Sequence, residues 1–288
     1  MRLAALAFLS LVSFSSAAAI DAADILGQAQ ADVPFAKQSG WGGQFLGKYP
    51  DAKMIPESGV HGEPLANGET LRFGKVDDPA RPGRKALAFQ LAPVDPMTSS
   101  SKRAEIAFDP NIEPERVYWI AFSLYVYDWG SLPRGDESLF GTQVHSGDNS
   151  RGLSPSFTLG TFRGGSTFVI AVQHSRSPDP TPRNMVSRKY PEMPIPFGRW
   201  TDFVFRFRHS QRDDGFLQAW MDGREVVDYR GPLGFYTPGH KDYAKFGYYN
   251  WSTFSSSRKV LLRSPVLVAD PSGAKYREED LRGFVQAH

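Results

Sequence analysis

The sequence predicts an all-β protein: a β-jelly roll, meaning a concanavalin-like sandwich of two antiparallel sheets, built as a single domain. Two observations lead to this prediction. Short runs of alternating apolar and polar residues, separated by Gly, Pro, Asn and Asp, follow one another from about residue 70 to 268. Helical periodicity is weak outside Ile20–Gln30 and the tail near Glu278–Val285. Many short strands without intervening helices are typical of sandwiches and jelly rolls.

Each expected strand is a short alternating or apolar run bounded by turn residues. In chain order these runs span 85–93, 103–108, 117–129, 139–145, 154–162, 166–175, 199–209, 215–230, 245–251 and 259–269. The 215–230 run contains Asp222-Gly223 between two alternating stretches, a strong hairpin signal. Segment 176–198 carries six prolines between two expected strands. A structureless loop of that length is functional or disordered, so it either edges a groove or is an ordinary surface excursion.

The start of the chain resembles a secretory signal peptide. Arg2 precedes an apolar run from Leu3 to Phe14, followed by small residues suited to cleavage after Ala19. A membrane anchor is the alternative, but the run is shorter than the roughly 20 apolar residues that span a bilayer. We therefore expect a signal peptide over 1–19, an N-terminal segment over 20–59 that packs on the domain, and the β-jelly roll over 60–288. The mature protein would be secreted or periplasmic, with no membrane attachment.

Composition excludes several classes of partner and site. The formal net charge is +2, and it falls to +1 once Arg2 is removed with the signal peptide. Nucleic-acid binding usually needs a marked basic excess, so we expect no nucleic-acid partner. The chain has no cysteine, which rules out disulfides and thiolate metal sites. We expect a monomer, stabilised by an ordinary core.

Three expected strands carry polar residues at alternating positions, which share one face of a strand. Arg103 and Glu105 form one such pair, and Gln143 and His145 form another. The third strand places Tyr243, Lys245, Gly247 and Tyr249 on one face. A solvated sheet face would produce the same alternation. The combined set is nevertheless unusual. It holds an imidazole, two phenols, two cations, a carboxylate and an amide, and these groups could converge in one groove.

The motifs that are missing narrow the chemistry. The strands offer no E-x-D-x-x-E carboxylate pair of the kind that glycoside hydrolysis usually needs, and G-x-S-x-G, H-E-x-x-H and Cys/His metal spacings are absent. His, Tyr, Arg, Gln and Lys together suit proton abstraction next to a carboxylate. Removing C5–H of a uronic acid builds up negative charge that cations and donors must stabilise. A base takes that proton, and an acid protonates the departing O4.

The motifs R-A-E-I (103–106), Q-V-H (143–145) and Y-A-K-F-G-Y-Y-N (243–250) resemble R-x-E-L, Q-[IV]-H and Y-F-K-x-G-x-Y-x-Q of the alginate lyases of polysaccharide lyase family 7. The likeness is closer to the glucuronan lyase and heparin-lyase-I-like group. That group also shares a P-x-F-x-L strand, here at 155–159, a W-x-D-F-V-F strand, here at 200–205, and a hairpin over 215–229. The resemblance covers roughly residues 60 to 268.

The resemblance implies roles for the site residues. Arg103 and Gln143 would neutralise the substrate carboxylate with help from Lys245, His145 would accept a proton, and Tyr249 would be the acid and, for some substrates, also the base. It implies further substrate-binding positions at Glu105, Tyr243 and Trp251. We expect Glu105 to hold Arg103 in place, Gly247 to leave room for a sugar ring, and Trp119, Trp129 or Trp251 to stack on sugars. The family needs no cofactor. Such folds can bind calcium, but no D-x-D cluster predicts it here.

Several functional interpretations remain open at this stage. The leading one is a polysaccharide lyase that acts on an anionic, glucuronan-like substrate by β-elimination. Trp251 replaces the final Gln of the alginate-lyase motif and Ala244 replaces its Phe, which weakens the assignment to alginate without excluding it. A non-catalytic jelly roll that binds acidic glycans is the first rival, and a glycoside hydrolase on the same fold is the second. The sequence does not decide between His145 and Tyr249 as the base.

Overall fold

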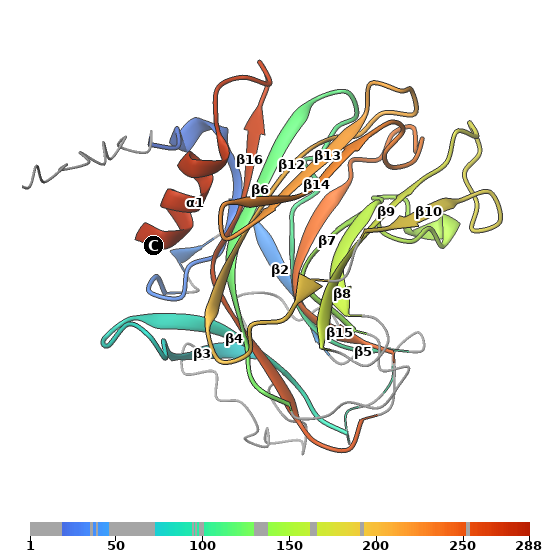
Figure 1. The fold of residues 1–288 in the computed structure, drawn as a ribbon. Coiled ribbons are helices and arrows are strands. Elements are labelled where there is room, and N and C mark those ends of the chain that lie inside the picture. Colours follow the sequence, from blue (N-terminus) through green and yellow to red (C-terminus); the bar gives the residue numbers. More distant parts are fainter. Residues whose placement is uncertain are drawn as a thin grey trace, which may run out of the picture.

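The computed structural model describes residues 19–34, 37–38, 40–45, 73–93, 95, 97, 101–129, 138–161, 166–190, 193–251 and 254–288. These residues form two antiparallel sheets of eight strands each, packed face to face, with one helix against the outside of one sheet (Figure 1). The jelly-roll prediction is therefore confirmed. The predicted signal peptide and much of the 20–59 segment lie outside the described residues.

Sheet A has the strand order β14-β13-β12-β6-β16-β4-β3, with β1 beside β16. Its strands are β1 (Ile25–Gln28), β3 (Phe73–Asp77), β4 (Lys85–Leu91), β6 (Val117–Val126), β12 (Trp200–Arg208), β13 (Phe216–Met221), β14 (Arg224–Arg230) and β16 (Arg258–Asp270). Asp222 and Gly223 connect β13 to β14 with φ values of 51° and 79°. Positive φ at both positions matches the hairpin turn predicted from the sequence.

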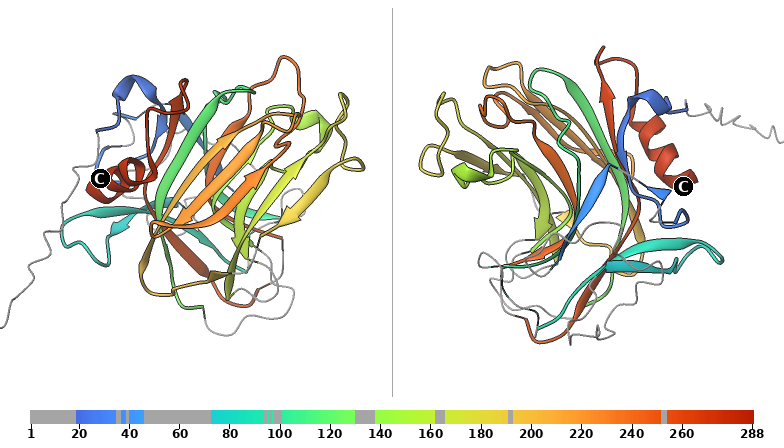
Figure 2. Two further views of the ribbon diagram at one scale, coloured as in Figure 1. Left: turned by 45° about the horizontal axis from the view of Figure 1, so that its top comes forward. Right: turned by 180° about the vertical axis from the view of Figure 1, so that it is seen from behind.

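Sheet B has the order β10-β9-β8-β7-β15-β5-β2, with β11 beside β9. Its strands are β2 (Trp41–Phe45), β5 (Lys102–Phe108), β7 (Ser138–His145), β8 (Phe157–Thr161), β9 (Thr167–His174), β10 (Val186–Lys189), β11 (Met193–Pro194) and β15 (Tyr243–Asn250). The short 3-10 helices η1 (Ala22–Asp24) and η4 (Asn149–Arg151) lie in the connections. The two sheets face each other in both views of Figure 2, and their strands curve.

Phenylalanine side chains fill the space between the two sheets. Phe122 of sheet A contacts Phe246 of sheet B with ring centroids 5.8 Å apart, and Phe157 of sheet B contacts Phe205 of sheet A at 5.6 Å. These rings are buried, and aromatic pairs add specific contacts to the burial of apolar area. Because side chains alternate along each strand, the opposite face of sheet B is left for polar residues.

Helix α1 (Glu278–Ala287) covers the outer face of sheet A. Its Leu281 and Val285 belong to a buried cluster with Val204, Val266 and Trp119. The prediction that Trp119 could stack on a sugar is therefore wrong, because its ring is buried in this cluster. Trp129 packs against Tyr248 with ring centroids 5.6 Å apart, so it also serves packing. No helix among the described residues is long and apolar enough to cross a membrane.

Two sequence-based expectations about secondary structure are corrected. Residues 20–30 form η1 and then β1, which pairs with β16, instead of a helix. The 176–198 segment is not structureless, because it contains β10 and β11, both paired with β9. β1 pairs with a strand at the far end of the chain, whereas β10 and β11 pair with the preceding strand β9. In each case the pairing satisfies the backbone groups of the segment. The tail helix near Glu278–Val285 is confirmed as α1.

Gly247 allows strand β15 to lie close to its neighbour in the middle of sheet B. Its φ is 140°, and a Cβ atom there would lie 2.4 Å from the carbonyl oxygen of Ala104 and 2.9 Å from the ring of Phe89. Both backbone conformation and space therefore require glycine at this position. The atoms that such a Cβ would meet belong to β5 and to the core, so the glycine serves strand packing, and the expectation that it leaves room for a sugar ring stays a prediction.

Replacing this glycine tests the constraint. We expect Gly247→Ala to lower the free energy of unfolding by about 3 kcal/mol or more, since it adds backbone strain and overpacking. Gly83→Ala is the matched control, because Gly83 also has positive φ but no atom lies within 4 Å of a Cβ there. That variant should lose only about 1–2 kcal/mol. Equal losses in urea denaturation would contradict the steric explanation.

Candidate active site

The three predicted polar strands are neighbours in sheet B, with β15 between β7 and β5. Their register places Tyr243 opposite His145 and Lys245 opposite Gln143 on β7. On the other side, Tyr249 lies opposite Arg103 of β5. The polar pairs that were found separately in the sequence thus belong to one face of one sheet.

A groove with a volume of about 430 Å³ lies on this face of sheet B. Residues of β5, β7, β8, β9, β10 and β15 contribute to its lining. Six of the predicted site residues line it: Arg103, Gln143, His145, Lys245, Tyr249 and Trp251. Glu105 and Tyr243 do not line the groove. They are buried beside it.

The ring of His145 is held in one orientation at the edge of the groove. Its Nδ1 lies 3.0 Å from the carbonyl oxygen of Ser146. A carbonyl can only accept a hydrogen bond, so Nδ1 carries the proton and Nε2 keeps its lone pair. Burial, followed by the positive charge of Lys245, lowers the pKa of His145 to about 4. The imidazole is therefore neutral near pH 7 and can accept a proton at Nε2.

Tyr249 and Arg103 face each other across β15 and β5. The guanidinium carbon of Arg103 lies 5.0 Å from the centre of the Tyr249 ring, a distance typical of a cation–π contact. Arg103 also donates a hydrogen bond to Ser101 Oγ at 3.0 Å. The Trp251 ring lies 5.6 Å from that of Tyr249. These contacts place a phenol, a cation and an indole at one end of the groove.

Gln143, not Arg103, is the hydrogen-bond partner of Glu105. Gln143 Nε2 donates to Glu105 Oε1, and among the described residues Arg103 forms no ion pair with Glu105. The expectation that Glu105 holds Arg103 is therefore wrong. An ionised carboxylate only accepts hydrogen bonds, so Glu105 fixes which way the Gln143 amide points. One N–H of that amide is used by Glu105, which leaves the second for a ligand.

Lys245 brings a second cation to the groove. It is 5 % exposed, and its ammonium lies 5.4 Å from the centre of the Tyr243 ring. Burial lowers the pKa of Lys245, the charge of Glu105 raises it and the charge of Arg103 lowers it. With Arg103 and Lys245 against Glu105, the groove has a surplus of positive charge and suits an anionic ligand.

The segment 176–198 edges the groove, one of the two alternatives that the sequence left open, but sequence reasoning did not find which of its residues do so. The pairings of β10, β9, β8, β7 and β15 place one row of residues across sheet B, namely Lys189, Ala171, Thr158, Gln143 and Lys245. All five line the groove, as do Ser187 and Gln173. The available signal was the alternation in VSRK (186–189), but six surrounding prolines made this segment read as a loop.

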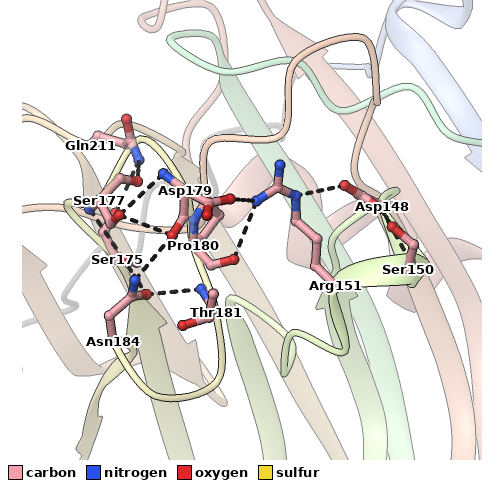
Figure 3. Close-up of polar contacts among 10 residues, drawn as sticks. All are labelled: Asp148, Ser150, Arg151, Ser175, Ser177, Asp179, Pro180, Thr181, Asn184 and Gln211. Atoms are coloured by element: carbon pink, nitrogen blue, oxygen red, sulfur yellow. Dashed lines mark hydrogen bonds and ion pairs between the residues drawn. The ribbon is translucent and has the colours of Figure 1, made fainter.

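Polar contacts fix the loops at one end of sheet B. Figure 3 shows Arg151 of η4 reaching between Asp148, at 2.8 Å from Nε, and Asp179 in the loop before β10. Asn184 Oδ1 accepts hydrogen bonds from Ser175 Oγ and the Thr181 amide, both at 2.9 Å. The chain continues from η4 into Leu153, Ser154 and Pro155, which line the groove. These contacts therefore stabilise part of its wall.

No group of three or more His, Asp or Glu side chains that could hold a metal ion occurs in the part of the chain that the structure describes. The polar side chains of the groove can instead supply general acid–base groups and hydrogen-bond donors. Such a set can neutralise a carboxylate, accept a proton and donate one.

Comparison with known proteins identifies the family. The sequence model of the family described as "Polysaccharide lyase" matches residues 39–262. No curated protein sequence matches the chain significantly.

Solved structures of similar fold include three polysaccharide lyases. The endo-beta-1,4-glucuronan lyase of the fungus Trichoderma reesei is 13 % identical, with a TM-score of 0.57, over 69 % of this chain and 87 % of that one. The exolytic alginate lyase AlyA5 of Zobellia galactanivorans is 12 % identical, with a TM-score of 0.54, over 84 % and 98 %. Alginate lyase A1-II', of polysaccharide lyase family 7, is 16 % identical, with a TM-score of 0.53, over 81 % and 95 %. At these identities the likeness shows the shared fold.

The protonation of His145 can be measured directly. We expect nuclear magnetic resonance to show its imidazole titrating near pH 4, below the ordinary value of 6.5. Lys245→Gln should raise the pKa of His145, because it removes a nearby positive charge, whereas Lys85→Gln on sheet A should not. Since the folded protein holds this proton less tightly than the unfolded chain, His145 should also lower stability as the pH falls from about 6.5 to about 4. A titration at or above 6.5 would refute this description.

Proposed function

Because this chain belongs to the polysaccharide lyase family, we propose that it cleaves a uronic-acid-containing polysaccharide by β-elimination in the groove of sheet B. The observation that carries the proposal is the position of His145, neutral and with Nε2 unprotonated, in the same groove as Tyr249, Arg103, Gln143 and Lys245. This set contains a base, an acid and donors for a carboxylate.

The substrate carboxylate would lie against Arg103, Gln143 and Lys245. Removing the proton from C5 delocalises negative charge onto that carboxylate, so preorganised cations and the free amide N–H of Gln143 lower the barrier. Glu105 contributes by fixing the Gln143 amide. Arg103 and Lys245 are held by contacts with Ser101, Tyr249 and Tyr243, so little reorganisation is needed as the charge develops.

In the elimination, the electrons of the C5–H bond form the C4–C5 double bond, and those of the C4–O4 bond leave with O4. A base takes the C5 proton and an acid protonates O4. In D-glucuronate and D-mannuronate, H5 and O4 leave from the same side, so Tyr249 could perform both transfers. In L-guluronate and L-iduronate they leave from opposite sides, and His145 would be the base facing Tyr249.

A glucuronan-like substrate is the preferred form of this proposal. Trp251 lines the groove beside Tyr249, in the place where the alginate-lyase motif has Gln. An indole at this position offers a flat surface on which a sugar can stack. Alginate remains the second candidate, because the three motifs are shared with alginate lyases. We also propose that the protein is exported, on the basis of its N-terminal sequence.

The proposed reaction can be tested with a panel of polyuronates. Incubation with glucuronan, polymannuronate, polyguluronate, heparan sulfate and heparin should raise the ultraviolet absorbance for glucuronan, since β-elimination conjugates a C4–C5 double bond to the carboxylate. Tyr249→Phe should lower kcat by about 100-fold or more, the usual contribution of acid–base groups, and keep most of the binding. His145→Ala should do the same on a substrate for which His145 is the base, and a small loss on glucuronan would assign both transfers there to Tyr249. Tyr236→Phe and His288→Ala, both outside the groove, are the matched controls.

Other outcomes would redirect the assignment. An absorbance rise on polymannuronate or polyguluronate alone would make the protein an alginate lyase. Saturated products would indicate hydrolysis, and binding without any product would favour the non-catalytic interpretation. Full activity in both groove variants would refute the proposed site.

A second prediction concerns the far end of the row across sheet B. Lys189→Gln should raise the KM for long substrates about two- to fivefold with little change in kcat, because an exposed ion pair contributes about 0.2–1 kcal/mol. The effect should shrink at high salt. Lys85→Gln, an exposed lysine of sheet A, serves as the control. An unchanged KM at low salt would show that the substrate does not reach β10.

A further inference from the structure

A buried serine, histidine and aspartate connect the two sheets behind the groove. His209 directly follows β12 of sheet A, whereas Ser156 and Asp242 directly precede β8 and β15 of sheet B. His209 Nε2 lies 2.8 Å from Ser156 Oγ, and His209 Nδ1 lies 2.9 Å from Asp242 Oδ2. The exposures of the three residues are 1 % for Ser156, 3 % for His209 and 7 % for Asp242.

This order of contacts resembles a catalytic Ser-His-Asp triad, but access argues against a nucleophile. Ser156 lines neither the groove nor the separate cavity of about 420 Å³ that His209 and Asp242 border. Its hydroxyl also lies within hydrogen-bond distance of the Val144 carbonyl, at 3.2 Å. A nucleophilic serine must reach a substrate carbonyl beside an oxyanion hole. The cluster is therefore better explained by the backbone segment that it contacts.

The cluster contacts the backbone on both sides of His145. Before it, the carbonyl of Val144 accepts a hydrogen bond from the Ser156 amide at 2.7 Å and contacts the Ser156 hydroxyl. After it, the Gly147 amide donates to Asp242 Oδ1 at 3.2 Å. His209 contacts both Ser156 and Asp242, the two residues that bind this backbone.

Two further features press the same segment into place. A Cβ atom on Gly147 would lie 2.1 Å from the Lys241 carbonyl oxygen, so this glycine permits close contact with the residues before β15. Tyr243 follows Asp242 directly, and its ring centre lies 5.7 Å from that of His145. The strand that supplies Lys245 and Tyr249 is thus fixed relative to His145 at the same point.

We propose that Ser156, His209 and Asp242 form a buried positioning cluster that fixes the backbone around His145 and so aims its Nε2 into the groove. This inference rests on the proposed function, because it assumes that His145 acts in proton transfer. His209 Nδ1 lies 2.9 Å from Asp242 Oδ2 without good hydrogen-bond geometry to any acceptor, so this contact holds the two buried side chains together by close packing. Through His209, the cluster connects the segment around His145 in sheet B to sheet A.

Electrostatics supports the same assignment. His145 is surrounded by Lys245 and Arg103, which lower its pKa, and by Asp242, which raises it. Removing the carboxylate of Asp242 would therefore leave the imidazole a weaker base as well as a less well-oriented one. Ser156 and His209 act only through orientation.

The test compares variants of this cluster with a buried ion pair elsewhere. Asp242→Asn, His209→Gln and Ser156→Ala should each lower kcat about tenfold or more while changing KM less than about twofold. Asp242→Asn should also lower the pKa of His145 measured by nuclear magnetic resonance. The matched control is Asp78→Asn, which breaks the buried pair with Arg263 on sheet A and should reduce stability without lowering kcat per folded molecule.

The outcomes separate this inference from the proposed function. The kcat per folded molecule of each cluster variant is compared with that of Asp78→Asn. If the values are equal, the cluster is only structural and the inference is overturned. If His145→Ala itself keeps full activity, the proposed role of His145 fails. In that case the chemical shifts of the His145 imidazole still test whether the cluster positions it. They should change in Ser156→Ala and not in Asp78→Asn, and unchanged shifts in Ser156→Ala would overturn the inference.

Discussion

The register of strand β15 is the constraint on which both the core and the groove depend. Ala244, Phe246 and Tyr248 point into the core, while Tyr243, Lys245 and Tyr249 belong to the other face. A shift of one residue would exchange the two sets and place an ammonium among phenylalanines. Gly247 helps to fix this register, since only glycine fits its backbone conformation and its contact with β5. The same strand therefore stabilises the fold and assembles the site.

Burial of the site's charged groups opposes folding, but it strengthens their interaction with an anionic ligand. Glu105 is 2 % exposed, and its Oε2 lacks a hydrogen-bond partner, as does Nε of Arg103. Buried polar groups without partners destabilise a fold unless another interaction offsets them. The large aromatic core between the sheets provides that offset here. The buried cations of the groove are poorly hydrated and held in position. Their attraction for an anionic ligand is therefore stronger than it would be in water.

Local alternation in the sequence was sufficient to predict β4 to β9 and β12 to β16, the hairpin at Asp222-Gly223 and five residues that line the groove, while Trp251 came from the family resemblance. It failed where the outcome depends on which segments of the chain pair with one another. Residues 25–28 are a strand because β16 lies beside them, and Lys189 lies in the groove because β10 pairs with β9. Glu105 and Gln143 are 38 positions apart, so their hydrogen bond was invisible beside the adjacent Arg103. The cluster around His209 joins both sheets and has no local signature.

His145 and Tyr249 lie at different points along sheet B, yet both face the same groove. Tyr243, the partner of His145, lies six residues before Tyr249 on β15, which in a flat strand would be about 20 Å. His145 and Tyr249 nevertheless both line the groove of about 430 Å³, and the strands of sheet B are curved (Figure 2). A substrate chain lying along the row from Lys189 to Lys245 would cross the strands between the two groups. Its bond could then be reached from both sides, by an imidazole fixed through sheet A and a phenol fixed by Arg103.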